Sequence, residues 1–303
     1  MKKKKSGEVA LVLSGGGARG LAHIGVIEEL TARGYRIRSI AGCSIGSVVG
    51  GLYAVGKLED YKNWILPMDK IDILRLVDFT LSGRGLIKGE RIFERLGELG
   101  MIPEVDIQDL PLPFAAVAVD IRGNREVVFR SGSLPNAIRA SIGIPSVFTP
   151  VPQGDLLLVD GGVLNPLPLE HADRKKGDIL VAVDLTSLIP YDKPILADQG
   201  RKIRPHSKKI AALLERWDAL LGNRDHAEQG GRKDREIGYF NLVTRSVQLM
   251  QHGLTRCALE RNPPDVLIQI AEESAGLFEF YKAQELVAYG RERCAEALDR
   301  WEG

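Results

Sequence analysis

The stretch VALVLSGGGARGLAHIGVIEEL (residues 9–30), followed by IRSIAGCSIGSVVGGLYAV (residues 37–55), determines the architecture of this chain. Each half is an apolar run, then a glycine-rich loop, then a segment with apolar residues at helical spacing. Continuous apolar runs are typical of strands that are buried on both faces. Strand, helix, strand and helix in this order predict a parallel sheet with helices on its faces. Gly34 is expected to end the first helix.

The alternation of strand and helix patterns continues along the rest of the chain. Further strands are predicted at 114–119, 126–129, 156–159, 179–183 and 266–270. Further helices are predicted at 61–66, 71–76, 92–99, 134–141, 239–261 and 280–300. Residues 79–86 combine apolar side chains with glycines and are expected to form a loop. The chain is therefore predicted to be an α/β protein.

Composition limits what the chain can be. Its 303 residues, 44% of them apolar, suffice for one large α/β domain, and we assign residues 6–303 to a single domain. The formal net charge of +1 argues against wholesale nucleic-acid binding. The three cysteines, Cys43, Cys257 and Cys294, form no Cys-x-x-Cys pair. This argues against a disulfide framework and against a cysteine-based zinc site.

The N-terminal lysines resemble the start of a signal peptide, but the apolar run that follows extends only from Val9 to Leu13. The core of a signal peptide needs about 7–15 apolar residues. No stretch reaches the roughly 20 apolar residues of a membrane span. We therefore expect a soluble, cytoplasmic protein.

The first glycine loop allows two interpretations. Gly15, Gly17 and Gly20 satisfy the Gly-x-Gly-x-x-Gly pattern of dinucleotide-binding proteins, which also need an acidic residue at the end of the second strand. No carboxylate stands there, so we favour an anion hole built from backbone amides at a helix start. Arg19 either holds this loop, contacts an acidic group of the substrate, or pairs with a nearby carboxylate or carbonyl.

The second glycine loop fits a nucleophile elbow, Gly-x-Ser-x-Gly, with Ser44 at its apex. Gly42 and Gly46 are expected to let the strand and the helix approach each other closely. Ser44 then stands at a helix N-terminus, which stabilises a forming alkoxide. The neighbouring Cys43 is expected to be a small buried thiol. A nucleophile beside an anion hole is the minimum requirement for acyl-group chemistry.

A serine nucleophile needs a base, and no histidine follows a strand where a triad would require one. The five histidines are distributed over helices, a proline-rich turn and a polar segment: His23, His171, His206, His226 and His252. His23 is near the first loop but is expected to pack against the sheet. Asp160 ends an apolar strand at the edge where Ser44 should stand, and Gly161 and Gly162 follow it. Asp160 is therefore favoured over two other strand-end aspartates, Asp120, expected in a hairpin turn, and Asp184.

These motifs, in this order, resemble the patatin-like phospholipases. The block Ala140-Ser141-Ile142-Gly143-Ile144-Pro145 is also similar to the family pattern, and segments near 81–89, 243–251 and 264–269 resemble its bacterial, neuropathy-target-esterase-like branch. The resemblance runs from about residue 8 to residue 185. It implies a three-layer α/β/α fold with a mainly parallel central sheet, a helical insertion and a helical C-terminal part.

The resemblance also implies a chemistry: hydrolysis of lipid acyl esters by a Ser44–Asp160 dyad, through an acyl-enzyme and without metal or cofactor. Carried over to this chain, the oxyanion donors are the amides of Gly15, Gly16 and Gly17, with Ala18 and Arg19 adjacent. Phospholipid or another lipid ester is then the expected partner. Two alternatives stay open: acyl transfer to a lipid or alcohol acceptor, and a non-catalytic lipid-binding module. The intact Ser44 and Asp160 argue against the second.

Residues 190–236 are the most polar part of the chain and are predicted to form a basic insertion. An apolar stripe at helical spacing predicts one amphipathic helix within it, at 207–221, with Trp217 on the stripe and lysines beside it. The helix either lies in a membrane surface, which would make the protein peripheral, or packs on the domain or on a second subunit of a homo-oligomer. We favour packing.

Overall fold

The computed structural model describes residues 7–76, 90–145, 147–194 and 239–303. The predicted loop 79–86, the amphipathic helix 207–221 and most of the insertion lie outside the described residues, as do His206 and His226.

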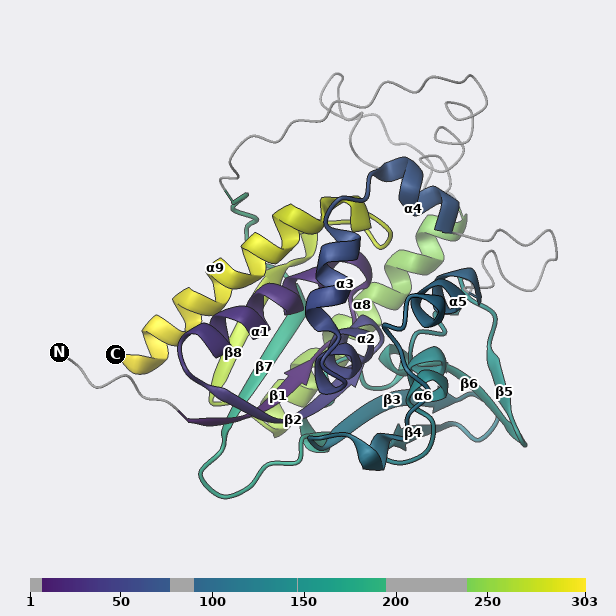
Figure 1. Ribbon diagram of the computed structural model, residues 1–303, viewed down its shortest axis with the longest axis horizontal. Coiled ribbons are helices and arrows are strands. Elements are labelled where there is room, and N and C mark those ends of the chain that lie inside the picture. Colours follow the sequence, from purple (N-terminus) through teal and green to yellow (C-terminus); the bar gives the residue numbers. More distant parts are fainter. Residues whose placement is uncertain (1–6, 77–89, 146, 195–238) are drawn as a thin grey trace.

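A central sheet organises the described part of the chain (Figure 1). Its eight strands are β1 (Glu8–Leu13), β2 (Arg36–Cys43), β3 (Phe114–Asp120), β4 (Arg125–Phe129), β5 (Val151–Gln153), β6 (Leu156–Asp160), β7 (Ile179–Ser187) and β8 (Val266–Ala271). The order is β5-β6-β3-β2-β1-β7-β8, and β4 pairs with β3. The run β3-β2-β1-β7-β8 is parallel, whereas the pairings of β4, β5 and β6 are antiparallel. The predicted mainly parallel sheet is confirmed.

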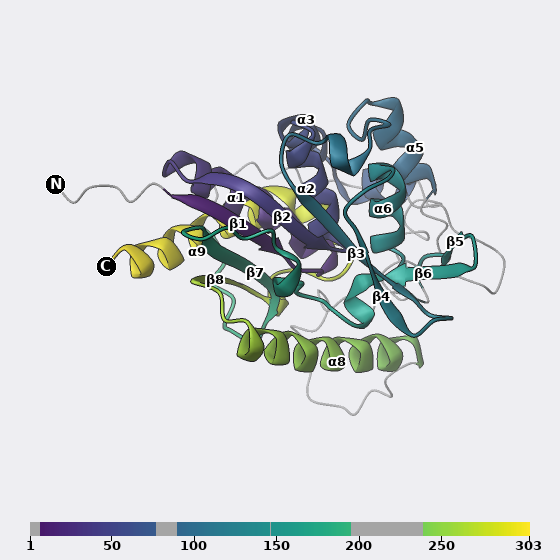
Figure 2. The same cartoon turned by 90° about the horizontal axis from the view of Figure 1, so that it is seen from below.

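Helices cover both faces of this sheet (Figure 2). One face carries most of them, and the other carries α8 (Tyr239–Arg261). The remaining helices are α1 (Ala22–Ala32), α2 (Ile45–Ala54), α3 (Leu58–Ile65), α4 (Lys70–Leu76), α5 (Glu90–Glu98), α6 (Leu134–Ser141) and α9 (Ala283–Glu302). The three-layer α/β/α arrangement and the helical C-terminal part agree with the prediction. None of the described helices combines the length and apolar character needed to cross a bilayer.

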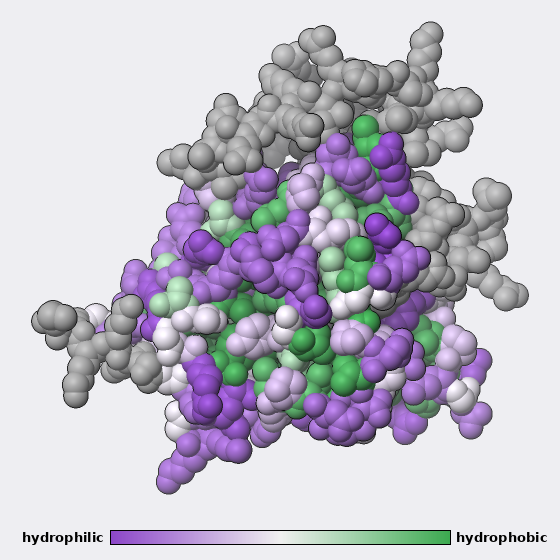
Figure 3. Space-filling model, viewed as in Figure 1, coloured by the Kyte–Doolittle hydropathy of each residue, from purple (hydrophilic) through white to green (hydrophobic). Residues whose placement is uncertain are grey.

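The main core lies between the sheet and the helices of the larger layer. The strands contribute buried residues such as Leu11, Leu13 and Ile40, and the helices contribute residues such as Leu30 and Leu52. Hydrophilic residues cover most of the outer surface of this layer, with hydrophobic residues in patches between them (Figure 3). This is the pattern of amphipathic helices with one apolar stripe turned inward. A smaller cluster, including Ala10, Val12 and Leu180, packs under α8.

Helices α1 and α9 lie side by side and cross at two glycines (Figure 1). A Cβ atom on Gly25 would lie 1.9 Å from the Val287 carbonyl oxygen, and one on Gly290 would lie 2.0 Å from the Ala22 carbonyl oxygen. These distances are too short for a Cβ atom, so only glycine fits at the two positions. The C-terminal helix therefore packs directly on the helix that follows the first glycine loop.

The direction of β6 was not anticipated from the sequence. The sequence predicts Asp160 at the sheet edge where parallel strands end, but β6 runs antiparallel to β3. The position is nevertheless at that edge, because β3 continues beyond β2 and provides the extra length on which β6 pairs. Asp160 pairs with Ala118, one residue beyond Val117, which pairs with Cys43 at the end of β2.

Candidate active site

Ser44 lies between β2 and α2, in the backbone conformation of a nucleophile elbow. Its φ is 53° and its ψ is −127°, and Asn124 is the other non-glycine residue with positive φ in the described part of the chain. Residues that carry a side chain rarely adopt a positive φ, because this backbone conformation is strained. Backbone strain of this kind is concentrated at functional sites. Ser44 is 5% exposed.

Close packing holds the elbow in place. A Cβ atom on Gly42 would lie 2.5 Å from the Gly46 carbonyl oxygen, and one on Gly46 would lie 2.2 Å from the Leu13 carbonyl oxygen. The two glycines therefore permit the predicted close approach of strand and helix. The Ser44 amide donates to Ser141 Oγ at 2.9 Å, and this hydroxyl donates to the Val117 carbonyl at 2.6 Å. Ser141 thus ties the elbow to β3.

Asp160 ends β6 beside the elbow and is 4% exposed. Its Oδ1 accepts hydrogen bonds from the Gly162 amide at 2.7 Å and from Cys43 Sγ at 3.8 Å. Oδ2 is buried and has no partner of ordinary hydrogen-bond geometry in the described structure. Burial raises the pKa of Asp160 to about 6, although the Ser44 hydroxyl and the Gly162 amide act to lower it. The carboxyl group is thereby a stronger base than an exposed aspartate.

Cys43 is fully buried, as predicted. Burial, together with the negative charge of Asp160, raises the pKa of its thiol well above the ordinary value. A thiol that stays protonated is a poor rival to Ser44 as nucleophile.

The first glycine loop leads from β1 into a short 3-10 helix, Gly17–Leu21, and lies directly against the elbow. A Cβ atom on Gly15 would be 3.2 Å from the Cβ atom of Ser44. The Gly15 amide donates to the Pro166 carbonyl at 3.1 Å, and the Ala18 amide donates to the Leu277 carbonyl at 2.9 Å. The amides of Gly16 and Gly17 have no acceptor among the described residues. Their N–H groups therefore have no competing acceptor in the described part of the chain.

Arg19 holds this loop from behind. It is 4% exposed, and it donates from Nε to the Gly16 carbonyl at 3.1 Å and from Nη1 to the Glu272 carbonyl at 3.0 Å. Burial lowers its pKa, and the nearby Glu272 opposes that effect. Three roles were open for Arg19. These contacts agree with the role in which Arg19 pairs with backbone carbonyls and so holds the loop.

The other candidate acids and bases have structural partners. His23 is fully buried, lies 3.0 Å from the Ser14 carbonyl oxygen, and has a pKa lowered to about 4 by burial, so it packs against the sheet as expected. Asp120 accepts from the amides of Arg122 and Leu157, as expected of a turn residue. Asp184 accepts from the hydroxyls of Thr186 and Ser187.

One cluster near the site has the residue types of a metal site. Glu126, Glu170 and His171 place one ligand atom each within 4.8 Å of one another. His171 Nε2 lies 3.0 Å from Glu126 Oε2, and the Asn165 side chain donates to both glutamates. The Asn165 amide also donates to the Gly161 carbonyl at 2.8 Å. Through these hydrogen bonds, the Glu126–Glu170–His171 cluster and Asn165 support the loop that follows Asp160.

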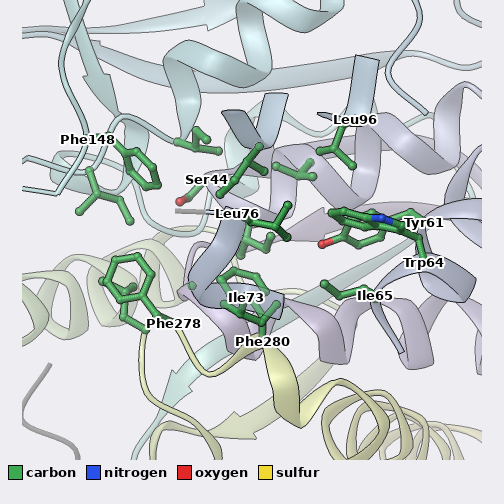
Figure 4. A pocket seen from close by; sticks show the side chains of 17 residues that line it. Ser44, Tyr61, Trp64, Ile65, Ile73, Leu76, Leu96, Phe148, Phe278 and Phe280 are labelled. Carbon is green, nitrogen blue, oxygen red and sulfur yellow. The ribbon is translucent and has the colours of Figure 1, made fainter. Parts of the chain in front are cut away.

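Ser44 lines a cavity of about 120 Å³ (Figure 4). Tyr61 and Trp64 of α3 lie at one end and Phe148 lies at the other, while Ser44 lies between them on the side of Phe148. Apart from Gly17, Ser44 and the Tyr61 hydroxyl, its lining is largely hydrocarbon and aromatic: Ile45, Val48, Trp64, Ile65, Ile73, Leu76, Ile92, Leu96, Ile142, Ile144, Phe148, Leu277, Phe278 and Phe280. No local sequence pattern predicts this apolar lining, because its residues come from separate helices and loops.

Sequence comparison identifies relatives along nearly the whole chain. A sequence model of the family "Patatin-like phospholipase" matches residues 11–173. An uncharacterised NTE family protein of Mycobacterium tuberculosis is 34% identical, covering 98% of this chain and 93% of the relative. Mouse patatin-like phospholipase domain-containing protein 6 is 32% identical, covering 67% of this chain and 16% of the mouse protein.

The structural comparison agrees on the fold. The crystal structure of VipD from Legionella pneumophila matches with a TM-score of 0.50 at 15% identity, covering 98% of this chain and 67% of VipD. The sequence matches extend through the glycine loop, the elbow and the Asp160 segment, and the relatives include NTE family proteins. The chain therefore belongs to the patatin-like phospholipase family, in its NTE-like branch.

Proposed function

We propose that this protein hydrolyses lipid acyl esters, as a serine carboxylic-ester hydrolase of the phospholipase A or lysophospholipase type. The observation that carries the proposal is the position of Ser44 at the edge of an apolar cavity. An ester held at Ser44 places its hydrocarbon chain among apolar side chains, where each buried methylene contributes about 0.8 kcal/mol. Membership of the family supports the same substrate class.

In the proposed first half-reaction, Ser44 Oγ attacks the carbonyl carbon of the ester while its proton passes to Asp160 Oδ2. The carbonyl oxygen becomes an oxyanion that accepts hydrogen bonds from the amides of Gly16 and Gly17. The tetrahedral intermediate then expels the alcohol or lysolipid, which takes the proton from Asp160. The product is an acyl ester of Ser44.

In the second half-reaction, water attacks the acyl carbon and gives a proton to Asp160. The second intermediate expels Ser44 Oγ, which recovers that proton, and the fatty acid leaves. A base with a pKa of about 6 suits both steps near neutral pH, because it is mostly ionised but still accepts a proton readily. The cycle uses no metal or cofactor.

We further propose that residues 6–303 act as one catalytic domain whose contact with a lipid surface is peripheral. The cavity that Ser44 and Trp64 line supports this proposal, because it offers apolar surface for an acyl chain beside the nucleophile. The insertion and a second subunit remain predictions from the sequence.

The test uses the full chain with chromogenic acyl esters and phospholipid vesicles, and identifies products by mass spectrometry. We expect Ser44→Ala and Asp160→Asn to lower turnover by about 10⁴-fold, because neither can complete the proton transfer. Ser246→Ala, on the exposed face of α8, serves as the matched serine control and should keep full activity.

A folded Ser44→Ala protein with wild-type turnover would overturn the proposal. A wild-type protein that is not labelled by a fluorophosphonate would indicate a non-catalytic binding module. Formation of a new acyl ester when lysolipid or alcohol is added, in place of free fatty acid, would indicate acyl transfer.

A further inference from the structure

Helix α8 reaches the catalytic aspartate through one side chain, that of Gln251. Its Nε2 donates a hydrogen bond to the Gly162 carbonyl at 3.1 Å. Gly162 in turn donates its amide to Asp160 Oδ1 at 2.7 Å. A continuous path of two hydrogen bonds thus joins α8 to the carboxyl group.

Gly162 is held tightly between these two partners. A Cβ atom at this position would lie 2.6 Å from Gln251 Nε2 and 3.0 Å from Asp160 Oδ1. The residue therefore has little room to rotate while Gln251 is in place. Its carbonyl and its amide belong to adjacent peptide planes that meet at the Gly162 Cα atom, so a bond to the carbonyl restricts the backbone rotation that would turn the amide away.

The direction of that amide distinguishes the two oxygens of Asp160. Oδ1 receives the Gly162 amide and the Cys43 thiol, whereas Oδ2 receives neither. Oδ2, which has no partner of ordinary hydrogen-bond geometry in the described structure, is the oxygen available to take a proton from Ser44. If the Gly162 amide turned away from Oδ1, the Asp160 carboxyl group could rotate, and either of its oxygens could then face Ser44.

The same helix is anchored on the opposite side of the site. Arg245 of α8 pairs with Glu272 at 3.0 Å, and the Glu272 carbonyl accepts from Arg19, which holds the Gly16 carbonyl. Helix α8 therefore contacts the supports of both Asp160 and the glycine loop. The Arg245 and Gln251 contacts together hold α8 beside the site.

We propose that Gln251 is a positioning residue that holds Gly162 so that Asp160 presents Oδ2 to Ser44. The inference rests on the proposed Ser44–Asp160 mechanism. It assigns to α8, which lies on the far face of the sheet from α2, a part in aligning the base.

The test compares Gln251→Met, which keeps the length of the side chain and removes the donor, with Gln248→Met on the same helix as the matched control. We expect Gln251→Met to lower kcat/KM by roughly 10-fold, as for a lost hydrogen bond that orients a catalytic group. The apparent pKa of the acid limb of its kcat/KM–pH profile should rise by roughly 0.5 unit from the wild-type value near 6. The reason is that the Gly162 amide no longer favours the ionised form of Asp160. Gln248→Met should match the wild type in both measurements.

Gln251→Glu provides the second variant, since it also removes the donor and adds a negative charge near Asp160. It should move the acid limb further in the same direction, and it keeps the proposal testable if Gln251→Met does not fold. If both variants match Gln248→Met in kcat/KM and in the acid limb, the positioning role is wrong. If Ser44→Ala keeps its activity, the dyad itself is wrong, so the two failures are distinguishable.

Discussion

The buried carboxyl group of Asp160 links activity to stability. Burial raises its pKa from 3.8 to about 6. The unfolded chain therefore loses this proton at lower pH than the folded chain does. Between these two values the folded state binds more protons, so stability falls as pH rises. Above pH 6 the ionised group costs the folded state on the order of 3 kcal/mol.

We expect Asp160→Asn to stabilise the protein at pH 8 relative to the wild type, because the variant has no charge to bury. The difference should shrink towards pH 4, where the wild-type carboxyl group is protonated in the fold. Urea unfolding of both proteins at the two pH values measures this. A difference in unfolding free energy that is equal at pH 4 and pH 8 would contradict the expectation.

Among single residues, the sequence predicted the proposed reacting groups better than the residues that hold them in position. Ser44 and Asp160 follow recognisable strand ends, so their placement at one edge could be predicted. Ser141 and Gln251 contact residues 97 and 89 positions away, and no local pattern records such a pairing. The hydrogen bonds that the Gly15 and Ala18 amides donate were also not predictable, because their acceptors, Pro166 and Leu277, are distant in the sequence.

Helix α3 forms the far end of the Ser44 cavity. Tyr61 and Trp64 lie there, opposite the nucleophile (Figure 4). In the proposed mechanism, an acyl chain extends from Ser44 towards these rings. The space they occupy should therefore set how many methylene groups the cavity accepts.

We expect Trp64→Ala to shift preference towards longer acyl esters, since it extends the cavity. Each added methylene that is buried should raise kcat/KM by about fourfold relative to the wild type. A series of chromogenic esters of increasing chain length measures the shift. Trp301→Ala, at the end of α9, is the matched control, and an unchanged chain-length profile for Trp64→Ala would refute this role.

Most elements could be predicted from their apolar spacing. The structure places α6 and α8 at the predicted residues, and β1, β2 and β3 within a few residues of them. The three-residue strand β5 was missed, because Val151–Gln153 is too short to show a period. The antiparallel direction of β6 was missed because strand direction depends on tertiary pairing, which periodicity does not encode.

The crossing of α1 and α9 joins the two ends of the described chain. Gly25 and Gly290 bring the backbones into contact, and Arg33 adds an ion pair to Asp299 at 2.6 Å. Because α1 follows directly from the glycine loop and its 3-10 helix, the position of that loop depends on α9.

We expect Gly290→Ala to lower the free energy of unfolding by about 3 kcal/mol or more, because its methyl group meets backbone atoms that cannot move aside. Gly253→Ala on α8 has nothing within 4 Å of the added Cβ atom. It should instead stabilise the protein by up to about 1 kcal/mol. Thermal and urea unfolding of both variants provides the measurement, and equal stabilities would contradict the close packing.

The position of α9 also has a consequence during synthesis. Ser44 leaves the ribosome long before Gln251 and Gly290, so a nascent chain exposes its nucleophile before the helices that align the loop and the base exist. Until α9 packs on α1, the growing chain carries a serine without a complete catalytic site. If the proposed mechanism holds, ester hydrolysis starts only after α9 has been synthesised and has packed on α1.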